Sequence, residues 1–319
     1  MDRAGGSRDG GTRGLAAAAA GLLLVLPVAG ADPYLLDVMT TGLLLAVLAG
    51  SWDLVGGVAG QPSLGHAAFF GTATYGCALL TSLAGLPFPV AAGGALALCG
   101  AAAWLAGTLA APLSGPFAAL FTLAVGELLH EAALGLPIPS PSGVYSWGGE
   151  GGVPVALPWS DPSPWVSYYG ALAFLLASAL AMRRLARSGE GLLWRAVAGS
   201  ELFARASGVD VERHKRLAYL AGGLFAGAAG VGYAAHVGRA TAADFSVELS
   251  FQAAAFAAVG GRGTVVGPVL AALVLHAALQ GSGIPPSGRV LLYAAVLLVA
   301  LRFFPGGVAA AFGRRRNRK

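Results

Sequence analysis

Residues 88–111 read FPVAAGGALALCGAAAWLAGTLAA, an apolar run that contains no charged side chain. A helix needs about 20 residues to cross the roughly 30 Å hydrocarbon core of a bilayer, so this run predicts a transmembrane helix. Comparable runs lie on either side of it. Together they predict six crossings before Arg183, at 15–30, 34–55, 64–84, 88–111, 116–136 and 165–182.

The composition of all 319 residues leads to the same class of protein. Only 11% of the residues are charged and 56% are hydrophobic, whereas soluble domains carry about 25% charged residues. These values exclude a soluble globular or disordered protein. The 49 glycines suit helices that pack closely through small residues, and the alternating ten-residue strands of a lipid-facing barrel are not found. We predict an all-α, polytopic integral membrane protein.

The positions of the basic residues set the orientation of the chain. Of the 20 Lys and Arg, three lie in the arm 1–14, eight in the loop 183–216 and five in the tail 311–319. The positive-inside rule places all three segments in the cytoplasm. Six crossings from a cytoplasmic N-terminus also return the chain to the cytoplasm at Arg183. The net charge of +5 therefore needs no nucleic-acid partner.

Four apolar runs follow the basic loop, at 217–236, 248–261, 264–281 and 288–304, and the last three are shorter than the first. They bring the prediction to about ten crossings and keep the tail cytoplasmic. The run 248–261 is short and ends in Gly260-Gly261-Arg262-Gly263. We expect a thin or tilted crossing there, because a re-entrant segment would leave the tail on the wrong side.

The remaining segments complete the predicted organisation. We expect a disordered cytoplasmic arm at 1–14, a transmembrane domain at 15–310, an ordered extracytoplasmic loop at 137–164 and a cytoplasmic tail at 311–319. The first apolar run ends in Ala29-Gly30-Ala31, which is also consistent with a cleaved signal peptide. Cys77 and Cys99 lie in apolar stretches and are predicted to be buried free thiols.

The chain contains no recognisable catalytic sequence motif. The only lysines are Lys215 and Lys319, and neither belongs to a P-loop. The five histidines are scattered, and no H-E-x-x-H, C-x-x-C or G-x-S-x-G is present. We predict no catalytic residue, no metal and no cofactor, which leaves transport or scaffolding.

An ion-coupled transporter acting alone needs ionisable residues inside the membrane. Glu127, His130 and Glu131 share one helical face by their spacing, and Asp37 and Asp53 also lie in apolar runs. These groups are candidate proton carriers. We favour a simpler explanation, in which Glu127 and Glu131 lie in the wet interface near the extracytoplasmic end of their helix.

A polar motif opens the third apolar run and reads Gly60-Gln61-Pro62-Ser63-Leu64-Gly65-His66-Ala67-Ala68-Phe69-Phe70-Gly71. Gln61, Ser63 and His66 must face protein or water at this depth. They indicate either the lining of a substrate pathway or a hydrogen-bonded joint between helices. Pro62 is expected near the first turn of the helix, where its missing N–H costs least.

A second motif lies in the basic loop. Ser200 is predicted to cap a helix of two turns, Glu201 suits its positive end, and Gly208 is placed to end it. Leu202, Phe203 and Ala206 form an apolar stripe on this helix, which faces the cytoplasm or the membrane surface. Arg195 and Arg205 flank the stripe. A helix this short needs packing or a partner to persist.

A third motif is the G-x-x-x-G pair of Gly223 and Gly227. Such pairs mark a close contact between helices, either within the chain or at a subunit interface.

The order of these motifs resembles the membrane subunits of bacterial ABC importers for branched-chain amino acids, in particular the second of their two paired permeases. The resemblance covers roughly 15–310. It rests on the run 60–71, on the run 195–216 and on Gly260-Gly261-x-Gly263 with Gly267-Pro268.

The resemblance implies a coupling segment and several partners. The segment 201–208 would dock into a separate ATPase subunit, with Arg195 and Ser200 beside it. The partners implied are a homologous second permease, two ABC ATPase subunits and a periplasmic or lipid-anchored binding protein. Candidate residues of the substrate pathway are Gln61, Ser63, His66, Asp53 and Glu150.

Two departures from the family pattern bear on the solute. The family commonly has an Asn-Leu pair where this chain has Trp52-Asp53-Leu54, and it favours Thr-Gly-Gly-Ser-Asp-Gly where residues 146–152 read SWGGEGG. Similar permeases serve urea or short amides. We therefore predict a multi-pass permease of the bacterial inner membrane, without enzymatic activity, for branched-chain or related amino acids. The alternatives are a urea or amide permease and a single-chain, ion-coupled transporter.

Overall fold

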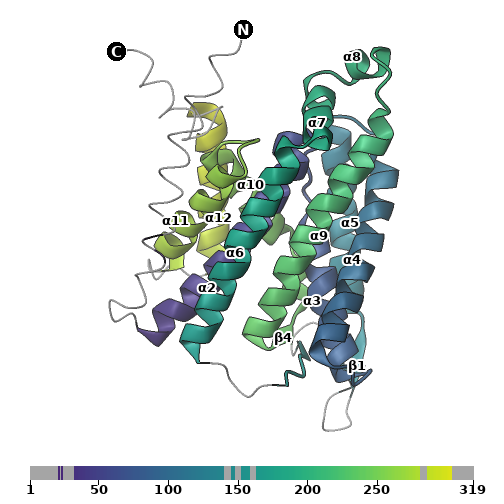
Figure 1. Cartoon of the computed structure of the whole chain (residues 1–319). Coiled ribbons are helices and arrows are strands. Elements are labelled where there is room, and N and C mark those ends of the chain that lie inside the picture. Colours follow the sequence, from purple (N-terminus) through teal and green to yellow (C-terminus); the bar gives the residue numbers. More distant parts are fainter. Residues whose placement is uncertain are drawn as a thin grey trace. The chain divides into compact units, whose positions relative to one another are not determined.

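A computed structural model describes residues 32–139, 145–147, 152–158, 163–280 and 286–303, together with Gly21 and Leu23. Within these ranges helices dominate (Figure 1). They are α2 (Pro33–Asp53), the π-helix η1 (Leu54–Val58), α3 (Ala67–Ser82), α4 (Phe88–Ala110), α5 (Pro116–Leu134), α6 (Pro164–Arg187), α7 (Gly189–Gly199), α8 (Glu201–Ala206), α9 (Val211–Val237), the 3-10 helix η2 (Ala242–Phe245), α10 (Val247–Gly260), α11 (Val266–Gln280) and α12 (Pro286–Phe303).

Several sequence predictions fall outside the described residues. They are the arm 1–14, nearly all of the crossing 15–30, the possible cleavage site at 29–31, the tail 311–319 and Glu150. Each later predicted crossing coincides with a helix. Among the described residues, five helices are long and apolar enough to span a membrane: α2 extended by η1, α4, α5, α6 and α9. The fold is therefore all-α and polytopic, as predicted.

The helix α10 is shorter than the five membrane-length helices and bears on the predicted thin crossing. Its 14 residues, at about 1.5 Å per residue, are shorter than a typical hydrocarbon core. The chain leaves α10 through Gly261 and Gly263, both of which have positive φ.

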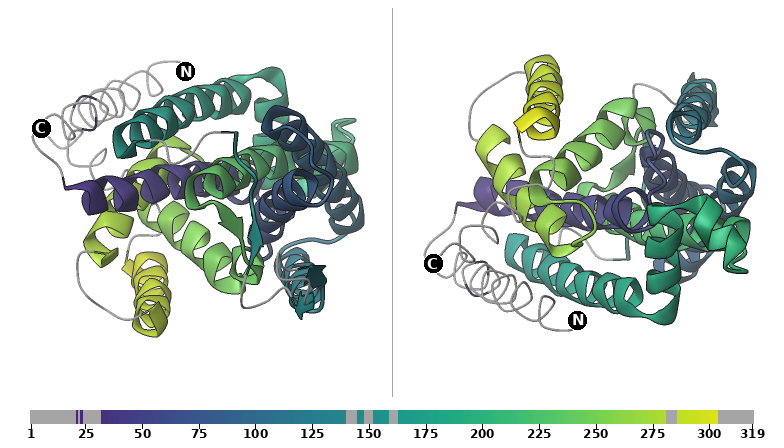
Figure 2. Two further views of the ribbon diagram at one scale, coloured as in Figure 1. Left: turned by 90° about the horizontal axis from the view of Figure 1, so that it is seen from below. Right: turned by 90° about the horizontal axis from the view of Figure 1, so that it is seen from above.

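The contacts divide the chain into two compact units that interleave in sequence. The first comprises 1–53, 162–183 and 252–319, and the second comprises 54–161 and 184–251. In the first unit α2 packs along α11 (Figure 2). A Cβ added to Gly42 of α2 would lie 3.0 Å from the ring of His276 on α11, so this contact relies on a small residue.

The second unit is built around α3, α4 and α9, which lie side by side (Figure 1). A Cβ on Gly223 would lie 2.4 Å from the Cβ of Ala103, and one on Gly227 would lie 2.6 Å from Sγ of Cys99. The G-x-x-x-G pair thus brings α9 against α4 of the same chain. Cys77 and Cys99 are buried free thiols, which confirms that prediction.

The described parts of the predicted loop 137–164 form short strands. The strand β1 (Pro137–Pro139) pairs antiparallel with β2 (Tyr145–Trp147), and Ile138 lies opposite Ser146. The strand β3 (Val153–Pro154) pairs antiparallel with β4 (Arg239–Ala240). Val153 and Ala240 belong to a buried apolar cluster with Tyr75 and Phe245, which ties the loop to the end of α3.

Candidate functional site

The helix α8 has the local structure predicted from its sequence. Ser200 caps it, because its hydroxyl accepts a hydrogen bond from the backbone N–H of Phe203 at 3.2 Å. Gly208 follows the helix with a φ of 81°, the left-handed conformation that commonly ends helices. The cap and the terminating glycine define this six-residue helix between two polar turns.

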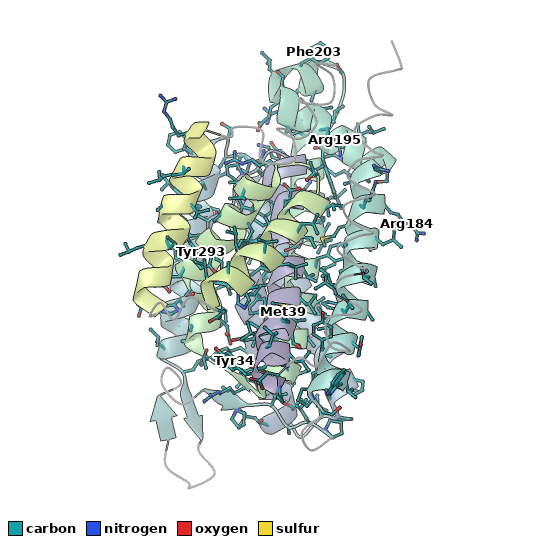
Figure 3. All side chains as sticks on the ribbon, turned by 90° about the vertical axis from the view of Figure 1, so that its left-hand side faces the viewer. Tyr34, Met39, Arg184, Arg195, Phe203 and Tyr293 are labelled. Carbon is teal, nitrogen blue, oxygen red and sulfur yellow. The ribbon has the colours of Figure 1, made fainter. Side chains whose placement is uncertain are left out.

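One face of α8 is exposed and apolar. Leu202 is 80% exposed and Phe203 is 74% exposed, and Figure 3 shows Phe203 projecting from the tip of this helix. On the opposite face Ala204 packs into a small buried cluster with Val197 and Val211. Burial of large apolar side chains is the main source of binding free energy at protein interfaces. This face therefore has the chemistry of a docking surface.

The helix α7 is a feature that the sequence analysis missed. It spans Gly189–Gly199 and begins at Ser188, whose hydroxyl accepts from the N–H of Gly191 at 3.4 Å. Nδ1 of His214 on α9 lies 2.9 Å from Oε2 of Glu190. The signal for this helix was present in the chain, because Ser188 precedes an acidic residue in a first turn.

Lys215 is the second missed residue. Its side chain is 1% exposed, and its Nζ lies 2.7 Å from Oε1 of Glu201. The same ammonium donates to the carbonyls of Ala111 at 3.2 Å and Leu113 at 2.9 Å. By sequence position alone, Lys215 is one cation of a basic loop. The signal was its identity, as a lone lysine among arginines.

The segment between η1 and α3 carries the polar motif and is not helical. Pro62 lies five residues before α3 begins at Ala67, so its predicted place in the first helical turn is wrong. The physical reason is a close contact at Gly65: a Cβ there would lie 1.8 Å from the backbone oxygen of Thr122. The N–H of Leu64 also donates to Oγ1 of Thr122 at 3.0 Å.

The three polar side chains of this motif are buried in the second unit. Gln61 is 2% exposed, and Ser63 and His66 are fully buried. Nε2 of Gln61 donates to Oε1 of Glu201 at 3.4 Å. The structure therefore joins one predicted pathway residue directly to the predicted coupling segment.

Asp53 is buried at the end of α2 and binds backbone. Its Oδ1 accepts from the N–H of Gly263 at 2.7 Å, and its Oδ2 accepts from the N–H of Val265 at 2.8 Å. Val265 has a φ of 61°, which is rare for a β-branched residue. The carboxylate thus holds the strained turn between α10 and α11.

The residues of the ion-coupled alternative are arranged differently. Glu127 and Glu131 are exposed, while Nδ1 of His130 lies 2.9 Å from the carbonyl of Ala242. Asp37 is exposed on α2. Within the described part of the chain no three His, Cys, Asp or Glu residues are grouped so as to hold a metal.

Comparisons with known proteins bear on the whole chain. Residues 34–301 match the family described as the permease component of the branched-chain amino acid transport system. The high-affinity branched-chain amino acid transport system permease protein LivM of Escherichia coli strain K12 is 28% identical over 280 residues, which cover 80% of this chain and 66% of that protein. The LivM protein of Salmonella typhimurium matches with the same identity and coverage. The matched region is slightly less than two thirds of the length of these relatives. No solved structure matches the chain.

Proposed function

The chain belongs to the family of permease components of branched-chain amino acid transport systems, and on that premise we propose that it is the membrane permease subunit of an ATP-driven importer. The solute would be leucine, isoleucine, valine or a related amino acid. The partners would be a homologous permease, two ABC ATPase subunits and a substrate-binding protein outside the membrane. The chain is a multi-pass membrane protein, and we place it in the bacterial inner membrane with both termini cytoplasmic.

The observation that carries this proposal is the exposed apolar face of α8. Leu202 and Phe203 project from a short capped helix in the most basic loop of the chain. A six-residue helix is marginal by itself, and its apolar face is unfavourable in water. An ATPase subunit docked on Leu202 and Phe203 would cover that face, with Arg195 and Arg205 at its rim. The chain would then need no nucleotide site of its own.

The proposal includes a pathway for the solute through the permease. The buried side chains of Gln61, Ser63 and His66 are its candidates, and Asp53 is a further candidate from its sequence position. Glu150 remains a candidate from its sequence position.

Transport assays on reconstituted vesicles separate the proposal from its alternatives. We expect labelled leucine to enter vesicles only when the chain is combined with its partner permease, its binding protein and ATPase subunits supplied with ATP. Parallel assays with labelled urea and acetamide test the amide alternative. Leucine uptake by the purified single chain under an imposed proton gradient, without ATPase subunits, would contradict the proposal and support ion coupling.

A further inference from the structure

The ammonium group of Lys215 uses its full bonding capacity. A lysine has three N–H donors, and Nζ of Lys215 lies within hydrogen-bond distance of three oxygens: Oε1 of Glu201, the carbonyl of Leu113 and the carbonyl of Ala111. Its side chain is excluded from water. Because a buried cation without its counter-ion is strongly unfavourable, this arrangement resists any motion that separates Lys215 from Glu201.

The part of α9 that carries Lys215 is held firmly against α4. A Cβ on Gly107 of α4 would lie 2.8 Å from the Cβ of Tyr219 and 3.2 Å from the Cα of Arg216. The backbones of the two helices are therefore close at the level of Lys215. Close packing of this kind leaves little room for sliding. Lys215 is a fixed point between α9 and the connection that follows α4.

The helix α8, in contrast, is held at few points. Ala204 packs into the small cluster with Val197 and Val211, and Glu201 pairs with Lys215. Glu201 is only two residues from the exposed Phe203, on a helix of six residues. A partner that pulls or pushes on Phe203 would consequently turn α8 about its attachment at Glu201.

Gln61 makes the weakest contact of this network. Its Nε2 lies 3.4 Å from Oε1 of Glu201, which is long for a hydrogen bond. Its own Oε1 is buried and has no hydrogen-bond partner among the described residues. A buried acceptor without a partner is costly. The amide of Gln61 is therefore poorly satisfied with α8 in this position, and a change in the position of α8 can improve or break its contact.

Resting on the proposed function, we propose that the Glu201–Lys215 ion pair is the pivot about which α8 tilts, and that Gln61 is the positioning residue that passes this tilt to the 60–66 segment. Adjacent packing supports the direct link. A Cβ on Gly60 would lie 2.7 Å from the Cβ of Ala198 on α7, so the 60–66 segment also abuts the helix that leads into α8. Movement at the docking face thereby reaches Ser63 and His66 without an intervening flexible linker.

The test uses the assembled importer in vesicles, with leucine uptake and phosphate release measured together. Gln61→Leu removes the amide and keeps a side chain of similar size. We expect at least a tenfold fall in leucine transported per ATP hydrolysed. A role confined to lining the pathway would raise KM for leucine and leave that ratio unchanged, and this result would overturn the proposal. Loss of the ATPase subunits from this variant would also overturn it, because Gln61 lies behind the docking face.

A second variant tests the pivot. Glu201→Gln removes the charge from the pair and keeps an oxygen that can accept from Lys215, and the same fall in the ratio is expected. Its matched control is Glu212→Gln, an exposed acid in the first turn of α9, which should keep the ratio of the unmodified importer. Gln252→Leu is the corresponding control for Gln61. Unchanged ratios in both test variants would refute the inference, whereas an unmodified chain that binds no ATPase would refute the proposed function itself.

Discussion

Nζ of Lys215 lies 2.7 Å from Oε1 of Glu201 and joins the first residue of α8 to the N-terminal part of α9. The pair is asymmetric, because Lys215 is buried while Glu201 is 29% exposed. The same carboxylate oxygen faces Gln61. One acidic residue therefore connects the helix that carries the exposed Leu202 and Phe203, the long helix α9 and the polar segment before α3.

Removal of Glu201 should destabilise the protein more than removal of the whole pair. Glu201→Ala leaves the buried ammonium of Lys215 with two carbonyls and no counter-ion. Loss of one partner from a buried pair costs roughly 3–5 kcal/mol, and the partial exposure of Glu201 places this pair at or below the lower end. The double variant with Lys215→Met removes the unpaired charge and should recover part of the loss. Thermal unfolding in detergent measures the stability of Glu201→Ala, of Lys215→Met and of the double variant. If the losses of the two single variants simply add up in the double variant, the two residues are not coupled.

Phe203→Asp should abolish co-purification of the ATPase subunits while the chain still inserts in the membrane. A charge at the centre of an apolar interface is desolvated without a partner, and central aromatic residues carry much of the binding free energy. Affinity pull-down from solubilised membranes measures the effect. The control is Leu83→Asp, an exposed apolar residue in the connection between α3 and α4, which should leave binding intact. Retention of the ATPase by Phe203→Asp would exclude this docking face.

Asp53→Asn should destabilise the turn between α10 and α11. The carboxylate accepts from two backbone N–H groups, one on each oxygen, whereas an amide has a single acceptor oxygen. One buried N–H would lose its partner, at a cost of about 1–3 kcal/mol. Asp37→Asn, at an exposed position of the same helix, is the matched control. Equal melting temperatures for both variants would show that the second acceptor is dispensable.

Gly65→Ala should prevent correct folding. The added Cβ would lie 1.8 Å from the carbonyl oxygen of Thr122, which is backbone and has little freedom to move. Gly93→Ala is the control, because nothing lies within 4 Å of its Cβ position and alanine favours a helix by about 1 kcal/mol. Yield of monodisperse protein in size-exclusion chromatography separates the two. A monodisperse Gly65→Ala variant would be the contrary result.

Asp244 should make stability depend on pH. Burial raises the pKa of this carboxyl to about 6, against the hydrogen bonds from Thr241 that lower it. The folded protein therefore holds a proton that the unfolded chain releases at its ordinary pKa of 3.8. The contribution of this proton to the free energy of unfolding is complete below pH 3.8 and is lost as pH rises through about 6. It amounts to roughly 3 kcal/mol. Between pH 4 and 7 the free energy of unfolding should fall less steeply for Asp244→Asn than for the unmodified protein. Parallel curves for the two proteins would assign the pH dependence to other groups.

Several features of this protein were predictable because they depend on residues adjacent in sequence. The apolar runs mark the helices, since hydropathy and helix length are properties of a continuous segment. The cap at Ser200 and the left-handed Gly208 follow from residues within one or two turns of α8. Pro62 shows the limit of such local reasoning, because α3 begins only at Ala67, after the close approach of Gly65 to the backbone of Thr122 on α5.

The contacts that would transmit movement could not be predicted in the same way. Gln61 and Glu201 are 140 residues apart, and Asp53 and Val265 are 212 apart. In the folded chain Lys215 is buried and pairs with one carboxylate. The free-energy cost of burying its ammonium group depends on which oxygens surround it, and the sequence does not show those oxygens. The sequence by itself determined that the chain is a multi-pass membrane protein with a short capped helix in its most basic loop. Only the tertiary structure decided which buried groups meet that helix, because such contacts arise from the packing of distant segments.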